Sequence, residues 1–190
     1  MLRLFLAIPV PETVKAKLRR LQQELQPLLP PQAVRWARPE QFHLTLKFLG
    51  NVPAENVEAL SKAAREVCSA TPPLRLRAEG TGLFPNDISP RVFWVEIKSE
   101  DGRLQLFQQQ LEAAVERFAE KQEAKKFASH VTLARLDRLR RDAVEKFMMR
   151  ARMDKRFGEW TAKEIELVQS QLMPTGALYA ILDTFKTKND

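Results

Sequence analysis

The chain has 190 residues, of which 44% are hydrophobic and 29% charged, as is typical of a globular protein that can bury a core of its own. Its 31 lysines and arginines exceed its 24 aspartates and glutamates. The net charge of +7 favours an anionic partner and excludes an acidic disordered chain. A single cysteine, Cys68, excludes an intrachain disulfide and a cysteine-rich metal site. We expect Cys68 to be a small buried hydrophobic residue.

No apolar stretch has the length needed to span a bilayer. The N-terminal apolar stretch, residues 4–10, is too short for a signal peptide and runs into Pro11 and Glu12 without a small-residue cleavage site. We therefore expect a cytoplasmic protein that is monomeric and has no membrane partner.

The positive charge is concentrated in residues 121–160, which contain 12 basic and 6 acidic side chains. Mixed charge of this kind is typical of a solvated helix face. The alternative is an electrostatic path that attracts phosphates, and binding would then weaken steeply with salt.

The first half of the chain alternates short apolar runs with amphipathic segments. It predicts strands at 3–8, 33–36, 42–49, 74–79 and 91–97, with helices beginning at Pro11 and Pro53. Gly50 and Asn51 are expected to end the strand 42–49. The first helix is predicted from apolar residues at alternating spacings of four and three: Val14, Leu18, Leu21, Leu25 and Leu28.

The second half repeats this organisation. It predicts a helix at about 102–118, a strand at 129–133, a charged helix at about 136–153, and strands at 164–169 and 177–185. Several strands follow one another without an intervening helix. This order indicates antiparallel or mixed sheets in an α+β fold, and not a doubly wound parallel sheet.

Both histidines of the chain stand in the same local pattern. His43 opens the sequence His-Leu-Thr-Leu, and His130 opens His-Val-Thr-Leu. On a strand, residues i and i+2 point to the same face, so each strand would present an imidazole beside the hydroxyl of Thr45 or Thr132. The same alternation buries Leu44, Leu46 and Phe48 behind His43, and Val131 and Leu133 behind His130.

Two imidazoles and two hydroxyls facing one another suit a phosphodiester. Hydroxyls can donate to the non-bridging oxygens, and displacement at phosphorus needs a base on one side and an acid on the other. Histidine serves both roles near neutral pH because its ordinary pKa is about 6.5. We expect no metal and no cofactor, because no further histidine or cysteine and no cluster of carboxylates stands near either motif. One such histidine alone is more often structural, and the duplicated context is what favours catalysis.

With these motifs, the chain resembles the 2H phosphoesterases, and within them the RNA 2′,3′-cyclic phosphodiesterases, once called 2′-5′ RNA ligases. The likeness covers nearly the whole chain. Besides the two histidine motifs it rests on residues 3–9, Arg35, Trp36, 47–50, 90–95, Ala134, Arg135, Gln171, Leu172, Pro174, Gly176 and Tyr179. Members of the family often have proline before the second histidine, where this chain has Ser129.

The resemblance implies a single bilobal domain over residues 1–190, with two pseudo-symmetric lobes, each an antiparallel sheet with outer helices, and an active-site cleft between them. It implies metal-independent hydrolysis of a terminal 2′,3′-cyclic phosphate on RNA to a 2′-phosphate, and in some members reversible 2′,5′ ligation. His43 would protonate the departing 3′ oxygen and His130 would activate water, although the two labels can be exchanged. Thr45 and Thr132 would hold the phosphate oxygens.

Several neighbouring side chains are secondary candidates. Arg135 resembles a family position near the phosphate, but strict alternation places it on the face opposite His130, so it reaches the cleft only if the strand ends or bulges first. Lys47 is expected on the face of His43, where it either adds positive charge or faces solvent. Phe48 and Trp36 either stack on a base or belong to the core. Arg91 either steers RNA or pairs with a surface carboxylate.

Two other functions remain open at this stage. One is a non-catalytic module that binds RNA ends, in which the histidines recognise the phosphate without cleaving it. The other is a phosphodiesterase of the same architecture that acts on small 2′,5′ or cyclic nucleotides.

Overall fold

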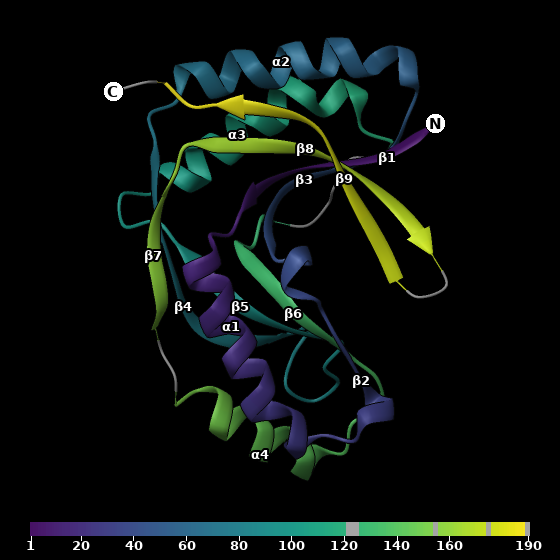
Figure 1. The fold of residues 1–190 in the computed structure, drawn as a ribbon, viewed down its shortest axis with the longest axis vertical. Helices are drawn as coiled ribbons and strands as arrows, with labels where there is room; N and C mark the ends of the chain where they lie inside the picture. Colours follow the sequence, from purple (N-terminus) through teal and green to yellow (C-terminus); the bar gives the residue numbers. More distant parts are fainter. Residues whose placement is uncertain (121–125, 154–155, 174–175, 189–190) are drawn as a thin grey trace.

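Two antiparallel sheets form the frame of the molecule (Figure 1). The structure, a computed structural model, describes residues 1–120, 126–153, 156–173 and 176–188. One sheet has the strand order β3 (His43–Val52), β1 (Leu2–Pro9), β8 (Glu164–Met173) and β9 (Gly176–Lys186). The other has the order β2 (Val34–Trp36), β6 (His130–Leu136), β5 (Val92–Lys98), β4 (Leu74–Phe84) and β7 (Arg156–Ala162). All neighbouring strands run antiparallel, so the predicted α+β class is confirmed.

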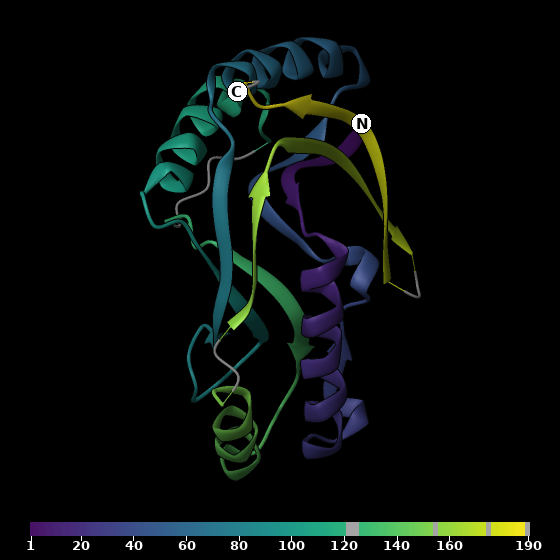
Figure 2. The ribbon, with the colours of Figure 1, turned by 60° about the vertical axis from the view of Figure 1, so that its left-hand side comes forward.

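Each sheet has its own helices, as Figure 2 shows. Helix α2 (Val57–Ala70) packs on α3 (Arg103–Val115) and on β8 and β9, and α3 also contacts β3. Helix α1 (Glu12–Leu25) contacts β7 and α4 (Arg141–Ala151) beside the five-stranded sheet. The two halves of the chain thus exchange helices. Helix α1 follows β1 but packs on the other sheet, and α3 follows β5 but packs on the sheet that contains β3.

Strand β1 is buried on both faces, which explains its continuous apolar sequence. Leu4, Leu6 and Ile8 belong to the main core, which extends through both sheets and their helices. Phe5 and Ala7 point to the opposite face, where they form a small separate cluster with Val168 of β8. The second face of the four-stranded sheet is therefore also partly apolar, and it is the face that carries His43.

Some predicted boundaries are wrong for identifiable reasons. Strand β3 does not end at Gly50, because Gly50 adopts a φ of +72° and the strand continues to Val52. The charged helix begins only at Arg141, since β6 runs on to Leu136. The sequence patterns do not predict strand β7. Leu28 is 39% exposed because α1 ends at Leu25 and a 3₁₀ turn (Gln26–Leu28) follows.

Other expectations are confirmed. Cys68 is fully buried on α2, and its burial raises the pKa of the thiol to about 12, so it is the inert hydrophobic residue that was expected. In the ranges that the structure describes, no helix has both the length and the apolar character needed to cross a bilayer.

Candidate active site

Strand β3 presents His43 and Thr45 on one face. In the pairing with β1, His43 lies opposite Pro9 and Thr45 lies opposite Ala7. Both side chains are half-buried, whereas Leu44 between them is fully buried in the core. The alternation predicted for this motif is confirmed.

Strand β6 presents His130 and Thr132 in the same way. They lie opposite Glu96 and Trp94 of β5, and both are half-buried. Val131 between them is fully buried. The second motif therefore repeats the first, although it belongs to the other sheet.

Side chains from the two sheets meet at the histidines. Strands β3 and β6 contact one another, and the imidazole of His130 is close enough for its charge to lower the pKa of His43. Burial raises the pKa of Tyr179 on β9, and the positive charges of Arg135 on β6 and of Arg3 on β1 oppose this shift. The contacts between β3 and β6 therefore bring the two motif strands together from different sheets.

Aromatic rings and a main-chain hydrogen bond hold the imidazole of His43. The ring of Phe5 stacks on it at 4.8 Å between centroids, and the edge of Tyr179 lies at 5.3 Å. The imidazole also forms a hydrogen bond with the main chain of Gln41, whose side-chain amide donates to Ala177 O at 2.8 Å. Burial is the largest effect on this group and lowers the pKa of His43 to about 4. The ring is therefore neutral in the free protein at neutral pH.

His130 has an equivalent environment. Phe84 and Trp94 lie edge-on to its ring at 5.0 and 6.1 Å, and these two aromatic rings stack on each other at 4.8 Å. Nδ1 lies 2.6 Å from the carbonyl oxygen of Ala128, which fixes Nδ1 as the donor and leaves Nε2 for chemistry. Burial lowers the pKa of His130 as well, against the opposing effect of this hydrogen bond.

A β-bulge follows each motif and changes which side chains share the histidine face. In β3 the register passes from Ala7–Thr45 to Leu6–Lys47, so Leu46 is an additional residue. In β6 it passes from Trp94–Thr132 to Phe93–Ala134, so Leu133 is additional. Beyond each bulge the alternation is inverted.

The bulge in β3 corrects two expectations. Lys47 does not share the face of His43 but is 1% exposed, and its ammonium pairs with the Glu112 carboxylate of α3. Phe48 is not buried behind the motif but is 38% exposed, and its ring lies 5.4 Å from that of Phe5 on the histidine face. The guanidinium of Arg3 lies 5.6 Å from the centroid of Phe48.

The bulge in β6 provides the condition under which Arg135 reaches the histidine face. Arg135 is exposed, and its positive charge partly opposes the rise that burial causes in the pKa of Tyr179 on the other sheet. Two other candidates do not join this site. Arg91 pairs with the Asp137 carboxylate at 2.8 Å, and Trp36 packs beside Phe147 in the core.

The four aromatic residues around the histidines had no role in the reasoning from spacing. They are Phe5, Phe84, Trp94 and Tyr179. For Phe5 a signal exists, because a strand that is apolar at every residue from 4 to 8 must bury side chains on both faces. Phe84 and Tyr179 contact the histidines through long-range pairing that no local pattern reveals.

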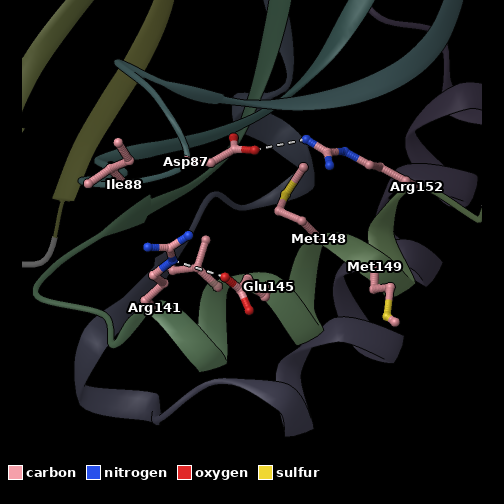
Figure 3. A pocket seen from close by; sticks show the side chains of 8 residues that line it. Asp87, Ile88, Arg141, Glu145, Met148, Met149 and Arg152 are labelled. Atoms are coloured by element: carbon pink, nitrogen blue, oxygen red, sulfur yellow. Dashed lines mark hydrogen bonds and ion pairs between the residues drawn. The ribbon is translucent and has the colours of Figure 1, made fainter.

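A cavity of about 510 Å³ lies away from both histidines, between α4 and the 85–90 loop (Figure 3). Met148 and Met149 line it together with Arg141 and Arg152. The two arginines pair with Glu145 and Asp87, at 3.0 Å in each case. These ion pairs neutralise the charge of the two arginines and favour the interpretation of the described part of residues 121–160 as a solvated helix face. Residues 121–125, 154–155 and Pro174 lie outside the described residues.

Comparison with known proteins defines the class to which this fold and site belong. The sequence profile of the LigT like Phosphoesterase family matches the chain twice, at residues 8–94 and 95–179, and the chain belongs to this family. The two matched segments correspond to the two halves that carry His43 and His130.

Individual relatives extend over the full chain. A Thermus thermophilus protein named RNA 2′,3′-cyclic phosphodiesterase is 33% identical over 100% of this chain and 92% of its own. A protein of the same name from Archaeoglobus fulgidus is 31% identical over 97% of this chain and 100% of its own. The crystal structure of the Thermus thermophilus protein TT0787 superposes with a TM-score of 0.82, at 30% identity and 99% coverage of both chains.

Proposed function

We propose that this protein is an RNA 2′,3′-cyclic phosphodiesterase in which His43 and His130 are the acid and the base. The observation that carries the proposal is that two contacting strands from different sheets, β3 and β6, each present a half-buried histidine and threonine on one face. The names of the full-length relatives support the same substrate class.

The reaction breaks one bond and forms another at phosphorus. A water molecule attacks phosphorus and loses its proton to one imidazole, while the bond from phosphorus to the 3′ oxygen breaks and the other imidazole protonates that oxygen. The product carries a 2′-phosphate. Following the resemblance, His43 is the acid and His130 the base, and Nε2 of His130 is free for this role because Nδ1 is engaged with Ala128.

The remaining groups hold the phosphate. The hydroxyls of Thr45 and Thr132 share a face with their histidines and donate to the two non-bridging oxygens. Arg135 adds positive charge from the second lobe. Because each lobe supplies one histidine and one threonine, residues 1–190 act as a single bilobal catalytic domain with RNA ends as the partner, in a monomer in the cytoplasm.

The test is release of 2′-phosphate from RNA that carries a 2′,3′-cyclic end, in EDTA, by the wild type, His43→Ala and His130→Ala. Each replacement is expected to lower the rate by about 10²- to 10⁴-fold. The control is Arg141→Ala, because Arg141 is exposed and pairs with Glu145 on α4, away from both histidines.

Full activity in either histidine variant would contradict the mechanism. Tight binding of cyclic ends without turnover over hours would indicate the RNA-end binding module. Faster turnover of mononucleotides than of oligonucleotides would indicate a small 2′,5′ or cyclic nucleotide as the substrate.

A further inference from the structure

Two buried glutamines donate to the main chain at the two bulges. Gln22 of α1 is 4% exposed, and its Nε2 donates to Leu133 O at 2.9 Å. Gln108 of α3 is 5% exposed, and its Nε2 donates to Leu46 O at 3.2 Å. Leu133 and Leu46 are the additional residues of the bulges that follow the histidine motifs.

Packing does not explain the choice of glutamine at these positions. Gln22 lies on the apolar side of α1 together with Leu18 and Leu25, where a leucine would suit the core equally well. Burying an amide is costly unless its hydrogen bonds are made. Both amides do make a second bond: Gln22 donates to Ala37 O at 2.9 Å, and Gln108 to Glu112 Oε2 at 3.0 Å.

The glutamine amides complete the hydrogen bonding of these two carbonyls. The Leu133 carbonyl oxygen also accepts from Ala37 N–H at 2.9 Å, so Gln22 supplies its second hydrogen bond. An additional residue interrupts the regular ladder of hydrogen bonds between strands, and a buried carbonyl with fewer donors than it can accept is unfavourable. Both bulge residues are buried, since Leu46 is 2% exposed and Leu133 is fully covered. Each glutamine therefore favours the bulged register over the regular one.

The bulged register decides the composition of the site. Without the additional residue, alternation would return Phe48 and Arg135 to the faces opposite His43 and His130. The bulge in β3 also buries Lys47, whose partner Glu112 is bonded to Gln108.

The arrangement is reciprocal between the two halves of the chain. Helix α1 of the first half supports the motif strand of the second, and α3 of the second half supports the motif strand of the first. His43 and His130 are 87 residues apart in sequence, and Gln22 and Gln108 are 86 apart. The glutamines thus occupy equivalent places in the internal duplication.

We propose that Gln22 and Gln108 are positioning residues of the active site, each of which holds the bulge that directs the following side chain, Arg135 or Phe48, to the histidine face. This inference rests on the proposed function for its activity readout. It concerns residues that do not touch the substrate and act through the main chain of β6 and β3.

The experiment measures kcat/KM on RNA with a 2′,3′-cyclic end for Gln22→Met and Gln108→Met, together with thermal unfolding. Each variant is expected to lose on the order of 10- to 100-fold, since small misplacements of catalytic groups have effects of this size. The matched control is Thr71→Val, which loses a buried side-chain donor to the main chain, Val67 O, outside the site. It should stay within about twofold of the wild type.

A double-mutant cycle separates positioning from general destabilisation. In the background of Arg135→Ala, Gln22→Met should cost less than about twofold, whereas Gln108→Met should keep its full effect. Equal effects of Gln22→Met in both backgrounds, or activity within about twofold of wild type in both glutamine variants, would overturn the proposal. If Gln22→Met does not fold, Gln108→Met in the background of Phe48→Ala provides the corresponding cycle.

An inactive wild type would refute the proposed function but not this inference. The crystal structures of Gln22→Met and Gln108→Met then decide it. Loss or displacement of the bulge at Leu133 or Leu46 is the expected result, and an unchanged register in both variants would overturn the proposal.

Discussion

Phe48 and Arg135 occupy equivalent positions, each five residues after the histidine of its strand and each turned to the histidine face by a bulge. The arrangement of histidine and threonine is therefore repeated in the two strands, but the side chains at the edges of the site differ. One lobe presents a phenyl ring packed on Phe5, and the other presents a guanidinium whose charge reaches Tyr179. A cyclic phosphate end has the same asymmetry, with the anionic phosphate on one side and the aromatic face of a nucleobase on the other.

The positive charge of Arg135 at the edge of the site predicts the effect of Arg135→Ala. We expect kcat/KM on cyclic-ended RNA to fall by about 10- to 100-fold, because a guanidinium near the phosphate stabilises its charge in a partly desolvated site. The slope of log affinity against log salt should decrease by about one. Both quantities are measured by titrating NaCl in activity and binding assays.

Arg141→Ala is the matched control for this prediction. Arg141 is also exposed, but it pairs with Glu145 on α4 away from the histidines. If Arg135→Ala and Arg141→Ala change kcat/KM and the salt dependence equally, Arg135 has no specific place at the phosphate.

Gly82 gives a second prediction, because it lies directly opposite Trp94 in the sheet. A methyl group at Gly82 would overlap the indole ring, which stacks on Phe84 and lies edge-on to His130. Gly82→Ala must displace these aromatic rings. We expect a loss of about 1–3 kcal/mol in the free energy of unfolding and a reduced kcat.

Gly102→Ala is the comparison for this substitution. Gly102 has a φ of +68° and no atom within 4 Å of the added methyl group, so its variant tests backbone strain without a clash. It should lower stability by about 1 kcal/mol without a change in kcat. Equal kcat values for Gly82→Ala and the wild type would show that the Trp94 ring does not position His130.

The sequence predicts the motif strands well because their period is local. Alternation from His43 to Leu46 and from His130 to Leu133 depends only on which residues are apolar, and both segments bury their aliphatic side as expected. The same rule fails one residue later, at Lys47. A bulge is a property of the pairing between strands, and no residue type in these two segments predicts it.

The distant parts of the site were beyond local reasoning for a similar reason. Phe84 reaches His130 only because β4 pairs with β5, and Tyr179 reaches His43 only because β9 pairs with β8. Gln22 and Gln108 did carry a local signal, since each interrupts the apolar side of its helix with an amide. The resemblance to a family supplied the two-lobed arrangement that spacing alone did not.

The lowered pKa of His43 predicts a specific dependence of stability on pH. The group has an ordinary pKa of 6.5 in the unfolded chain and about 4 in the folded protein, so the unfolded state binds more protons between these values. Its contribution is fully present above pH 6.5 and is lost as the pH falls towards 4. The free energy of unfolding should decrease over this range by up to about 3 kcal/mol through His43 alone.

Chemical denaturation of the wild type and His43→Gln between pH 4 and 7 measures this contribution. Glutamine is polar and does not titrate, while the carboxylates and His130 titrate in both proteins and cancel in the difference. The wild type should lose stability relative to His43→Gln as the pH falls. A difference that is constant over this range would show that the pKa of His43 is not lowered in the folded protein.

The assignment of acid and base gives the last prediction. In the proposed mechanism His43 donates a proton to the 3′ oxygen, although burial lowers its pKa to about 4, so that mechanism requires the bound phosphodiester anion to raise the pKa again. A substrate whose bridging 3′ oxygen is replaced by sulfur has a leaving group that departs as a thiolate and needs little protonation. Such a substrate should restore the activity of the variant that lacks the acid, and not that of the variant that lacks the base.

We therefore expect the 3′-thio substrate to recover most of the loss in His43→Ala, by about 10²-fold or more relative to the 3′-oxygen substrate, and to leave His130→Ala impaired. Single-turnover rates for both variants on both substrates make the comparison, with the wild type as the reference for the intrinsic reactivity of the thio substrate. Recovery of His130→Ala alone would exchange the two roles. This outcome is physically distinct, because it would mean that His130, whose Nδ1 is already bonded to Ala128, carries its catalytic proton on Nε2 in the free enzyme.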